Sequence, residues 1–238
     1  DIVLEIGPGL GTLTQELAKR ARKVIAVEKD GRMIKILGET LKGFRNIEVI
    51  QEDILKLNPK LYTLKPYKVV ANLPFYLTAP VIRKFLEHEN RPELMALVTQ
   101  KEVAQRICAK PPDMNLLAVS VQLYAQPKII AYVSKSSFWP QPKVDSAIIK
   151  ITPYKTAPPL LRKMKLSTSQ ADRLFFGVVK AGFSQPRKQL VNNLSKKLQL
   201  DKEKVRSWLL KNKIQPEQRA ENLTIEDWIN LAKTSDDK

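Results

Sequence analysis

The sequence predicts an α/β fold, a mainly parallel sheet covered by helices, followed by a small all-α domain. Two observations lead to this prediction. Residues 1–155 alternate short, continuous apolar runs with segments whose apolar residues recur at helical spacing, as expected for a buried parallel sheet. After Pro153, Pro158 and Pro159 the strand signals end and only helical patterns remain. We therefore predict two domains, residues 1–155 and residues 156–238.

The first domain contains the predicted strands. The apolar runs that predict parallel strands are residues 2–6, 24–27, 47–50, 68–71 and 94–98. Three helices are predicted between these strands. The first has apolar residues at helical spacing from Leu10 to Ala21, and the second begins after an Asp30 N-cap and ends at Gly43. The third begins at Thr78 and Pro80. Residues 102–108 and 115–124 read as helices, and residues 128–133 and 147–151 as a late hairpin.

The second domain is predicted to be helical and strongly basic. Its expected helices are residues 168–182, 186–198, 202–211 and 225–233, with residues 234–238 frayed. The whole chain has 41 Lys and Arg against 24 Asp and Glu, a net charge of +17. This charge favours nucleic acid as a partner, then an anionic membrane surface, over a basic surface kept only for solubility.

The remaining composition excludes several classes of protein. The 238 residues, 43% of them apolar, are enough for a core. A single cysteine, Cys108, and a single histidine, His88, exclude a disulfide framework and argue against a zinc site, so no metal is expected. We find no membrane-spanning run and no signal peptide, which predicts a cytoplasmic protein. The chain begins inside its first predicted strand, which suggests a fragment or a processed form.

Three glycines lie within five residues directly after the first strand, in Gly7-Pro8-Gly9-Leu10-Gly11. In that position Gly7 and Gly9 let the backbone approach a ligand at the carboxyl edge of the sheet. A dinucleotide fingerprint needs a third glycine at position 12, which is Thr12. The G-x-G-x-G spacing is more typical of S-adenosylmethionine (SAM) sites, although a purely structural turn is the alternative.

Two acids follow the next two strands. Glu28 ends the second strand, where a carboxylate accepts hydrogen bonds from ribose hydroxyls; the alternative is an ordinary exposed strand-end acid. Asp53 follows the third strand, where it could accept from the amine of an adenine; the alternative is a helix N-cap. The glycine turn and both acids at one sheet edge predict a nucleoside site more strongly than any of them alone.

The fourth strand ends in Asn72-Leu73-Pro74-Phe75-Tyr76. The N6 lone pair of adenine is delocalised into the ring and is a poor nucleophile. Hydrogen bonds from its N–H groups to the Asn72 oxygen and a backbone carbonyl would localise that lone pair, and a stacked aromatic ring would hold the base in line. This turn therefore predicts methylation of an adenine amine; a plain Asn-Pro turn with core aromatics is the alternative. A stiff aromatic platform follows later, beginning Phe138-Trp139-Pro140, and could stack on the other face of the base or form only a rigid hairpin corner.

These motifs occur in an order that resembles the small-subunit rRNA adenine N6,N6-dimethyltransferases of the KsgA type. The resemblance rests on Glu5-Ile-Gly-Pro-Gly, Asn72-Leu-Pro-Phe and Phe138-x-Pro-x-Pro-Lys-Val-Asp-Ser, with Gln100-Lys-Glu-Val-Ala and residues 181–194 in support. It covers nearly the whole chain. It implies a Rossmann-like class I SAM-dependent methyltransferase domain, residues 1–155, and a helical rRNA-binding domain, residues 156–238.

The resemblance also implies a function and a site. The function is dimethylation of two adjacent adenines near the 3′ end of small-subunit rRNA in the assembling 30S particle, by a monomer that needs no membrane. SAM is expected to contact Gly7, Glu28, Asp53 and Asn72, with Glu5 and Ile54 as weaker candidates. The target amine is expected at Asn72, Pro74 and Phe75, with Phe138 on the far face of the base. RNA contacts are expected at Arg187, Lys188, Lys196 and Lys197, although the last two could be a solvated helix face.

The sequence departs from the family in three places. The basic N-terminal segment that closes over SAM in the family does not precede Asp1, which leaves open whether this chain binds SAM weakly and whether it is active. Phe75 replaces a common Tyr, and the stretch beginning Asp113-Met-Asn lacks the usual Tyr-Gly-Arg-Leu-Ser. The alternatives left open are an antibiotic-resistance methyltransferase of large-subunit rRNA and a non-catalytic RNA-binding assembly or transcription factor on the same fold. A DNA adenine methyltransferase is less favoured, because no base-reading module is found.

Overall fold

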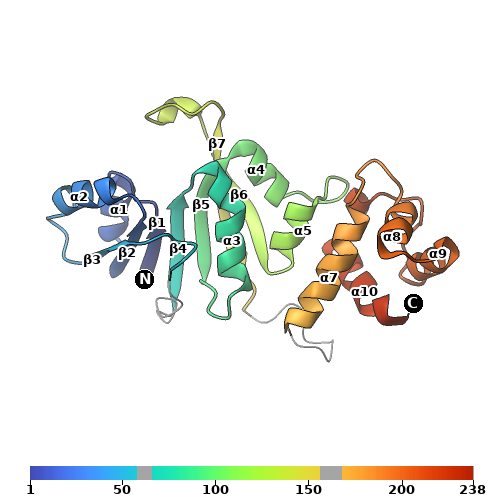
Figure 1. Cartoon of the computed structure of the whole chain (residues 1–238). Helices are drawn as coiled ribbons and strands as arrows, with labels where there is room; N and C mark the ends of the chain where they lie inside the picture. Colours follow the sequence, from blue (N-terminus) through green and yellow to red (C-terminus); the bar gives the residue numbers. More distant parts are fainter. Residues whose placement is uncertain (58–65, 156–167, 238) are drawn as a thin grey trace. The chain divides into compact units, whose positions relative to one another are not determined.

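The computed structural model describes residues 1–57, 66–155 and 168–237 (Figure 1). Contacts divide the chain into two compact units, one of residues 1–105 with 125–155 and one of residues 106–124 with 156–238. The sequence placed residues 106–124 in the first domain. The structure groups them with the C-terminal helices instead, where the Met114 amide donates to the Glu221 carbonyl at 3.1 Å.

The first unit is built on a seven-stranded sheet of order β3-β2-β1-β4-β5-β7-β6 (Figure 1). Strands β1 to β5 pair in parallel, whereas β7 is antiparallel to both β5 and β6. The predicted mainly parallel sheet and the late hairpin are therefore confirmed. The strands are β1 (Ile2–Ile6), β2 (Lys23–Glu28), β3 (Ile47–Gln51), β4 (Tyr67–Asn72), β5 (Leu94–Gln100), β6 (Ala125–Val133) and β7 (Ser146–Pro153).

The helices of this unit lie between its strands in the sequence: α1 follows β1, α2 follows β2, α3 follows β4 and α4 follows β5. They are α1 (Thr12–Ala18), α2 (Gly31–Thr40), α3 (Thr78–Glu87) and the start of α4 (Lys101–Ile107). The predicted Asp30 cap is confirmed, because its side chain accepts from the Arg32 amide at 2.9 Å. Helix α1 is shorter than its apolar pattern suggested. The Asn46 amide donates to the carbonyls of Ala18 and Ala21 at 2.8 and 2.9 Å, which satisfies the end of the helix there.

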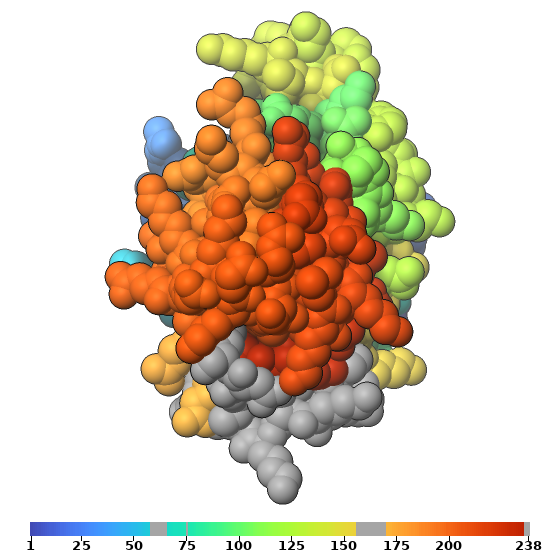
Figure 2. Space-filling view, turned by 90° about the vertical axis from the view of Figure 1, so that its right-hand side faces the viewer, coloured from blue at the N-terminus to red at the C-terminus, as the bar shows by residue number. Residues whose placement is uncertain are grey.

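The second unit contains α5 (Leu116–Gln122), α7 (Thr168–Gly182), α8 (Leu190–Leu198), α9 (Lys202–Lys211) and α10 (Ile225–Lys233). Figure 2 faces the side on which α8 and α9 lie in Figure 1. The core of the unit includes Phe175 and Trp228, both fully buried. No helix of the described ranges is both long enough and apolar enough to cross a membrane.

Two predicted helical boundaries in this unit are wrong. Helix α8 begins at Leu190 rather than at residue 186, because the Leu190 amide donates to the Gln218 carbonyl at 2.7 Å and ties the preceding turn to another loop. Residues 234–237 of the predicted frayed end form a short helix instead, η5 (Thr234–Asp237), and Lys238 lies outside the described residues. This short helix is fixed by Thr234, whose hydroxyl accepts from the Trp208 indole N–H at 2.8 Å.

Candidate active site

The register of the sheet brings the predicted site residues to one edge. Ile6 at the end of β1 pairs with Val27 on β2 and with Ala71 on β4. Glu28 at the end of β2 pairs with Gln51, the last residue of β3. The strand order reverses between β1 and β4, and such a switch point is where open α/β sheets bind ligands. The loops after β1 and β4, which carry the glycine turn and Asn72, therefore flank the switch point.

The glycine turn has the backbone that its sequence predicts. Gly7, Gly9 and Gly11 have φ angles of 67°, 58° and 86°, a left-handed conformation that other residues rarely adopt. A Cβ at Gly7 or Gly9 would meet nothing within 4 Å, so open space lies over this backbone. Gly11 differs, since a Cβ there would lie 3.0 Å from the Leu37 side chain. Gly7 and Gly9 thus leave room for a ligand, whereas Gly11 is required by packing against α2.

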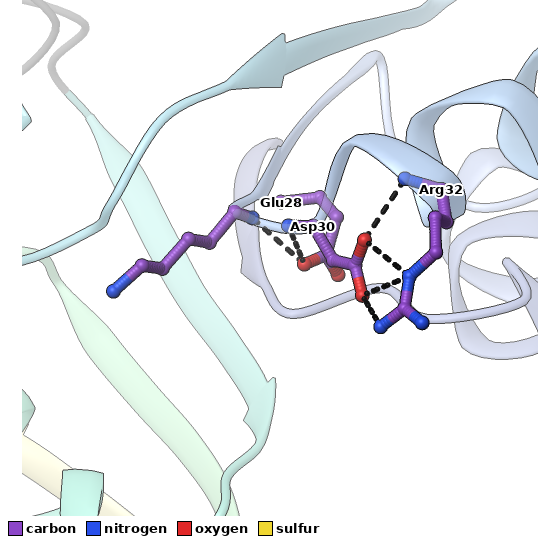
Figure 3. A network of polar contacts seen from close by, with 4 residues as sticks. Glu28, Asp30 and Arg32 are labelled. Atoms are coloured by element: carbon purple, nitrogen blue, oxygen red, sulfur yellow. Dashed lines mark hydrogen bonds and ion pairs between the residues drawn. The ribbon is translucent and has the colours of Figure 1, made fainter.

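Glu28 is held in place by the loop that follows it (Figure 3). Its Oε1 accepts from the amides of Lys29 and Asp30 at 2.7 and 2.8 Å. Its Oε2 accepts no hydrogen bond from any residue within the described ranges. The carboxylate is therefore oriented by one oxygen while the other is available to a ligand hydroxyl, as the ribose prediction requires.

Asp53 orients the turn that follows β3. Its Oδ1 accepts from the Leu55 amide at 2.9 Å, but residues 54–56 form a turn, so Asp53 is not the N-cap of a helix in the described residues. Its Oδ2 accepts from Lys29 Nζ at 3.0 Å. The hydrogen bond from Leu55, and then the one from Lys29, lower the pKa of Asp53, which keeps it ionised. Ile54, the next residue, is buried and offers an apolar contact at the same turn.

Lys29 is the site residue that sequence reasoning missed. It lies between Glu28 and Asp30 and reaches across to the turn after β3, so it joins the two acids of the predicted nucleoside site. Asp53 raises the pKa of Lys29, first through this hydrogen bond and then through its charge. The signal in the sequence was a cation directly between two acids at a strand end, in Val27-Glu28-Lys29-Asp30.

Glu5 lies within the strand beneath the glycine turn. It is 1% exposed, and its Oε2 is buried without a hydrogen-bond partner among the described residues. Burial raises the pKa of Glu5 to about 7, and the Thr14 hydroxyl offsets part of that effect. A buried acid with an unsatisfied oxygen below a glycine turn fits a site that receives a polar or cationic ligand.

Asn72 is exposed at the carboxyl end of β4, and its side chain has no hydrogen bond with any described residue. The turn after it is fixed on both sides. The Leu73 amide donates to the Val98 carbonyl at 3.2 Å, and the Leu77 amide donates to the Pro74 carbonyl at 2.9 Å. Pro74 is exposed. Phe75 begins the short helix η2 (Phe75–Leu77), and its side chain lies outside the described part of the structure. The Asn72 amide is thus presented at the edge by a constrained turn.

The loop that carries Phe138 reaches the same edge from the other end of the sheet. Ser146 of β7 pairs with Gln100 of β5 and with Val133 of β6, so the connection between β6 and β7 starts and ends at the carboxyl edge. The Lys101 amide donates to the Asp145 carbonyl at 3.0 Å, which ties this loop to the start of α4. Phe138 is half-buried within it.

The four predicted RNA-binding cations lie in the second unit, apart from this edge in the sequence. Arg187, Lys188, Lys196 and Lys197 are all exposed, and none forms an ion pair with a described carboxylate. Lys188 and Lys196 line a cavity of about 220 Å³ together with Ser184 and Asn192. In the described ranges, no cluster of His, Cys, Asp and Glu could hold a metal ion.

The left-handed glycines, the open space above them, the oriented Glu28 and the unsatisfied oxygen of Glu5 together fit SAM. Comparisons with known proteins show the family of the chain. A family model described as "Ribosomal RNA adenine dimethylase" matches residues 1–237. The "Ribosomal RNA small subunit methyltransferase A" of a Dehalococcoides mccartyi strain is 44% identical over 233 residues, 97% of this chain and 77% of that protein. The protein of the same name from Bacillus licheniformis is 42% identical over 242 residues, 97% of this chain and 80% of its own length.

Two solved structures share the fold across the whole chain. A dimethyladenosine transferase from Plasmodium falciparum superposes with a TM-score of 0.77 at 29% identity, over 99% of this chain and 90% of that one. The 23S rRNA methyltransferase ErmE superposes with a TM-score of 0.75 at 28% identity, over 99% of this chain and 91% of that one. The predicted Rossmann-like class I methyltransferase fold is confirmed by these likenesses.

Proposed function

Since the chain belongs to the ribosomal RNA adenine dimethylase family, we propose that it dimethylates N6 of two adjacent adenines near the 3′ end of small-subunit rRNA. SAM is the methyl donor of this family and supplies an electrophilic methyl group on a sulfonium. The single observation that carries the proposed mechanism is the exposed Asn72 amide, held at the carboxyl end of β4 beside the strand switch point.

The cofactor site proposed here is the edge formed by β1, β2 and β3. Gly7 and Gly9 allow close approach of the backbone, and the free oxygen of Glu28 accepts from ribose hydroxyls. Asp53 accepts from the adenine amine of the cofactor, and Ile54 contributes an apolar contact. Because Lys29 already donates to Asp53, it stays beside the adenine and offsets the charge of that carboxylate.

Asn72 activates the target amine by hydrogen bonding rather than by acting as a base. Its Oδ1 accepts one N6–H, and a carbonyl of the turn accepts the other. The Pro74 carbonyl already accepts from Leu77, so we assign this second bond to the carbonyl of Leu73. These two bonds localise the lone pair on N6 and aim it at the methyl group. The amine loses its proton to water once it is alkylated. A second SAM supplies the second methyl, and in that transfer the single remaining N6–H donates to Asn72 Oδ1.

Aromatic rings hold the target base in place. Pro74 and Phe75 lie two and three residues after Asn72, and we propose that they contact one face of the base while Phe138 contacts the other. The target adenine must leave its stack to enter such a site. Phe138 is suited to this because its loop is tied to α4 at the edge that bears Asn72.

The substrate assigned here is small-subunit rather than large-subunit rRNA. The two relatives named above act on small-subunit rRNA by name and are 42–44% identical, whereas the large-subunit enzyme ErmE is 28% identical. Primer extension across both rRNAs after reaction separates the two substrates.

The second unit is proposed to bind rRNA through phosphates and shape. Its cations at Arg187, Lys188, Lys196 and Lys197 are exposed, and phosphate contacts position a protein on RNA without reading sequence. We propose that the protein acts as a monomer on the assembling 30S particle.

The test is transfer of labelled methyl from SAM to small ribosomal subunits that lack the modification. The wild-type chain is expected to yield dimethyladenosine. Asn72→Ala is expected to lower the rate at least a hundredfold, while the Kd for SAM, measured by calorimetry, changes less than threefold. A matched control is Asn90→Ala, which alters an Asn at the opposite edge of the sheet, before β5. Asn72→Ala with wild-type turnover would refute the mechanism.

SAM binding without any methyl transfer by the wild-type chain would favour a non-catalytic RNA-binding factor. The same assay is therefore run beside a version extended at its N-terminus by the basic segment that the family resemblance implies. Activity of the extended version alone would keep the fold and the site but assign catalysis to the longer protein.

A further inference from the structure

Trp139 stands out among the tryptophans of the chain. It is 96% exposed, whereas Trp208 is 7% exposed and Trp228 is fully buried. An indole offered almost entirely to water makes no contribution to the core and marks a binding surface more often than a structural one. Tyr132, on the same hairpin, is also exposed.

Three cations surround the base of the loop that carries Trp139. Lys101, Lys135 and Lys143 line a cavity of about 400 Å³, with Glu102 and Asp145 as the acids. None of the three ammonium groups pairs with a carboxylate of the described residues. Lys101 lies over the Tyr132 ring, with 5.3 Å between Nζ and the ring centroid. These lysines are therefore free to meet phosphates, unlike Lys23, Lys29 and Lys68 of the same unit, which are paired.

This surface continues the edge that carries the proposed active site. The strands β4, β5 and β7 are neighbours, and Asn72 pairs with Val98 two residues before β5 ends at Gln100, which pairs with Ser146. Figure 1 shows the connection between β6 and β7 projecting beyond the end of the sheet, and it is at the top of Figure 2 as well. Strand β7, at which this loop ends, lies two strands from β4 on the same edge of the sheet, with roughly 4.8 Å between neighbouring strands.

We propose that Trp139 stacks on an unpaired nucleotide next to the target adenine, while Lys101, Lys135 and Lys143 bind the phosphates of the same strand. The inference rests on the proposed function. It extends that function by assigning the nucleotide next to the target adenine to a contact with Trp139. Stacking on an aromatic ring suits any base, so this contact positions the single strand without selecting its sequence. Charge complementarity and the shared sheet edge favour RNA over an apolar partner.

Tryptophan fluorescence tests the contact without methyl transfer. The difference between the emission of wild type and that of Trp139→Phe isolates Trp139, because the other two indoles are buried in both. A short oligoadenylate is expected to protect Trp139 from acrylamide quenching. The same oligomer annealed to oligouridylate, whose bases are already stacked, is expected to protect it much less. Equal protection by both, or RNA that binds and leaves the quenching unchanged, overturns the stacking.

Methylation kinetics give the second readout. Trp139→Ala is expected to raise the KM for small subunits about tenfold, the size of one lost stack, with kcat unchanged. Trp139→Phe, which keeps a ring, is expected to restore most of the loss. Ile130→Ala, an exposed apolar residue of the same hairpin, is the matched control. If Trp139→Ala has the KM of the wild type, the stacking inference is overturned and the proposed function is unaffected. If the wild type transfers no methyl, the fluorescence test alone decides whether Trp139 stacks on RNA.

Discussion

Replacing Glu5 by Gln is expected to change how the stability of the protein depends on pH. Glu5 is buried, and burial raises its pKa from the ordinary 4.5 to about 7. A carboxyl whose pKa is raised on folding holds its proton more tightly in the folded chain. Its contribution to stability is complete below about pH 4.5 and is lost as the pH rises to about 7. The gap between the two values corresponds to about 3 kcal/mol.

Glutamine is neutral at every pH, so the variant does not lose the stability that the wild type loses when Glu5 ionises. The free energy of unfolding of Glu5→Gln minus that of wild type is therefore expected to rise by up to about 3 kcal/mol between pH 5 and pH 8. Urea unfolding followed by circular dichroism, at four pH values across this range, measures it. The change with pH is the readout, because the amide also alters local hydrogen bonds by a constant amount.

Glu16→Gln on the neighbouring helix α1 is the control. Glu16 is exposed, and hydrogen bonds from Lys19 and then Arg20 lower its pKa. Its small contribution is therefore present above its ordinary pKa and is lost as the pH falls, the opposite direction to Glu5. A difference between Glu5→Gln and wild type that stays constant from pH 5 to pH 8 would show that Glu5 is ionised in the folded protein, and the reasoning would be wrong.

Three further predictions concern the cofactor, the C-terminal core and the RNA surface. Asp53→Asn is expected to weaken SAM binding about tenfold by calorimetry, the cost of one charge-assisted hydrogen bond, whereas Asp30→Ala, which removes a helix cap, is expected to lower the Tm and leave the Kd within threefold. Gly182→Ala is expected to destabilise the second unit by about 1–3 kcal/mol in urea unfolding, because its Cβ would lie 2.4 Å from the Trp228 ring; an unchanged midpoint would mean that the ring moves freely. A charge reversal is expected to weaken RNA binding and flatten its dependence on salt when it is made at three exposed cations together, Arg187, Lys188 and Lys196. An unchanged slope of log K against log salt would show that these cations do not contact the RNA.

The sequence predicted the elements of the site because each is local. A glycine turn after a buried strand, an acid at a strand end and an Asn-Pro turn need only their neighbours in the chain to be recognised. Parallel pairing then aligns the strand ends, so Glu28, Gly7 and Asn72 meet at one edge without further information. Whether these residues contact SAM and the target base stays a prediction.

What the sequence did not predict depends on contacts between distant segments. The end of α1 is set by Asn46, and the start of α8 by the carbonyl of Gln218, neither of which is near in sequence. Lys29 meets Asp53 from 24 residues away, through the pairing of β2 with β3. Residues 106–124 carry an ordinary helical pattern, which does not reveal the unit against which they pack.

The antiparallel end of the sheet has a consequence for how this protein behaves at high concentration. Strand β6 is an edge strand, and an unpaired edge is a template on which a second chain can add a strand. Three features of β6 oppose this: Pro127 lacks an amide hydrogen, Lys128 is exposed, and the ladder is interrupted between Ile129 and Ala131. The hairpin that carries Phe138 and Trp139 can therefore extend into water, where we propose that it meets RNA, while its outer strand resists self-association.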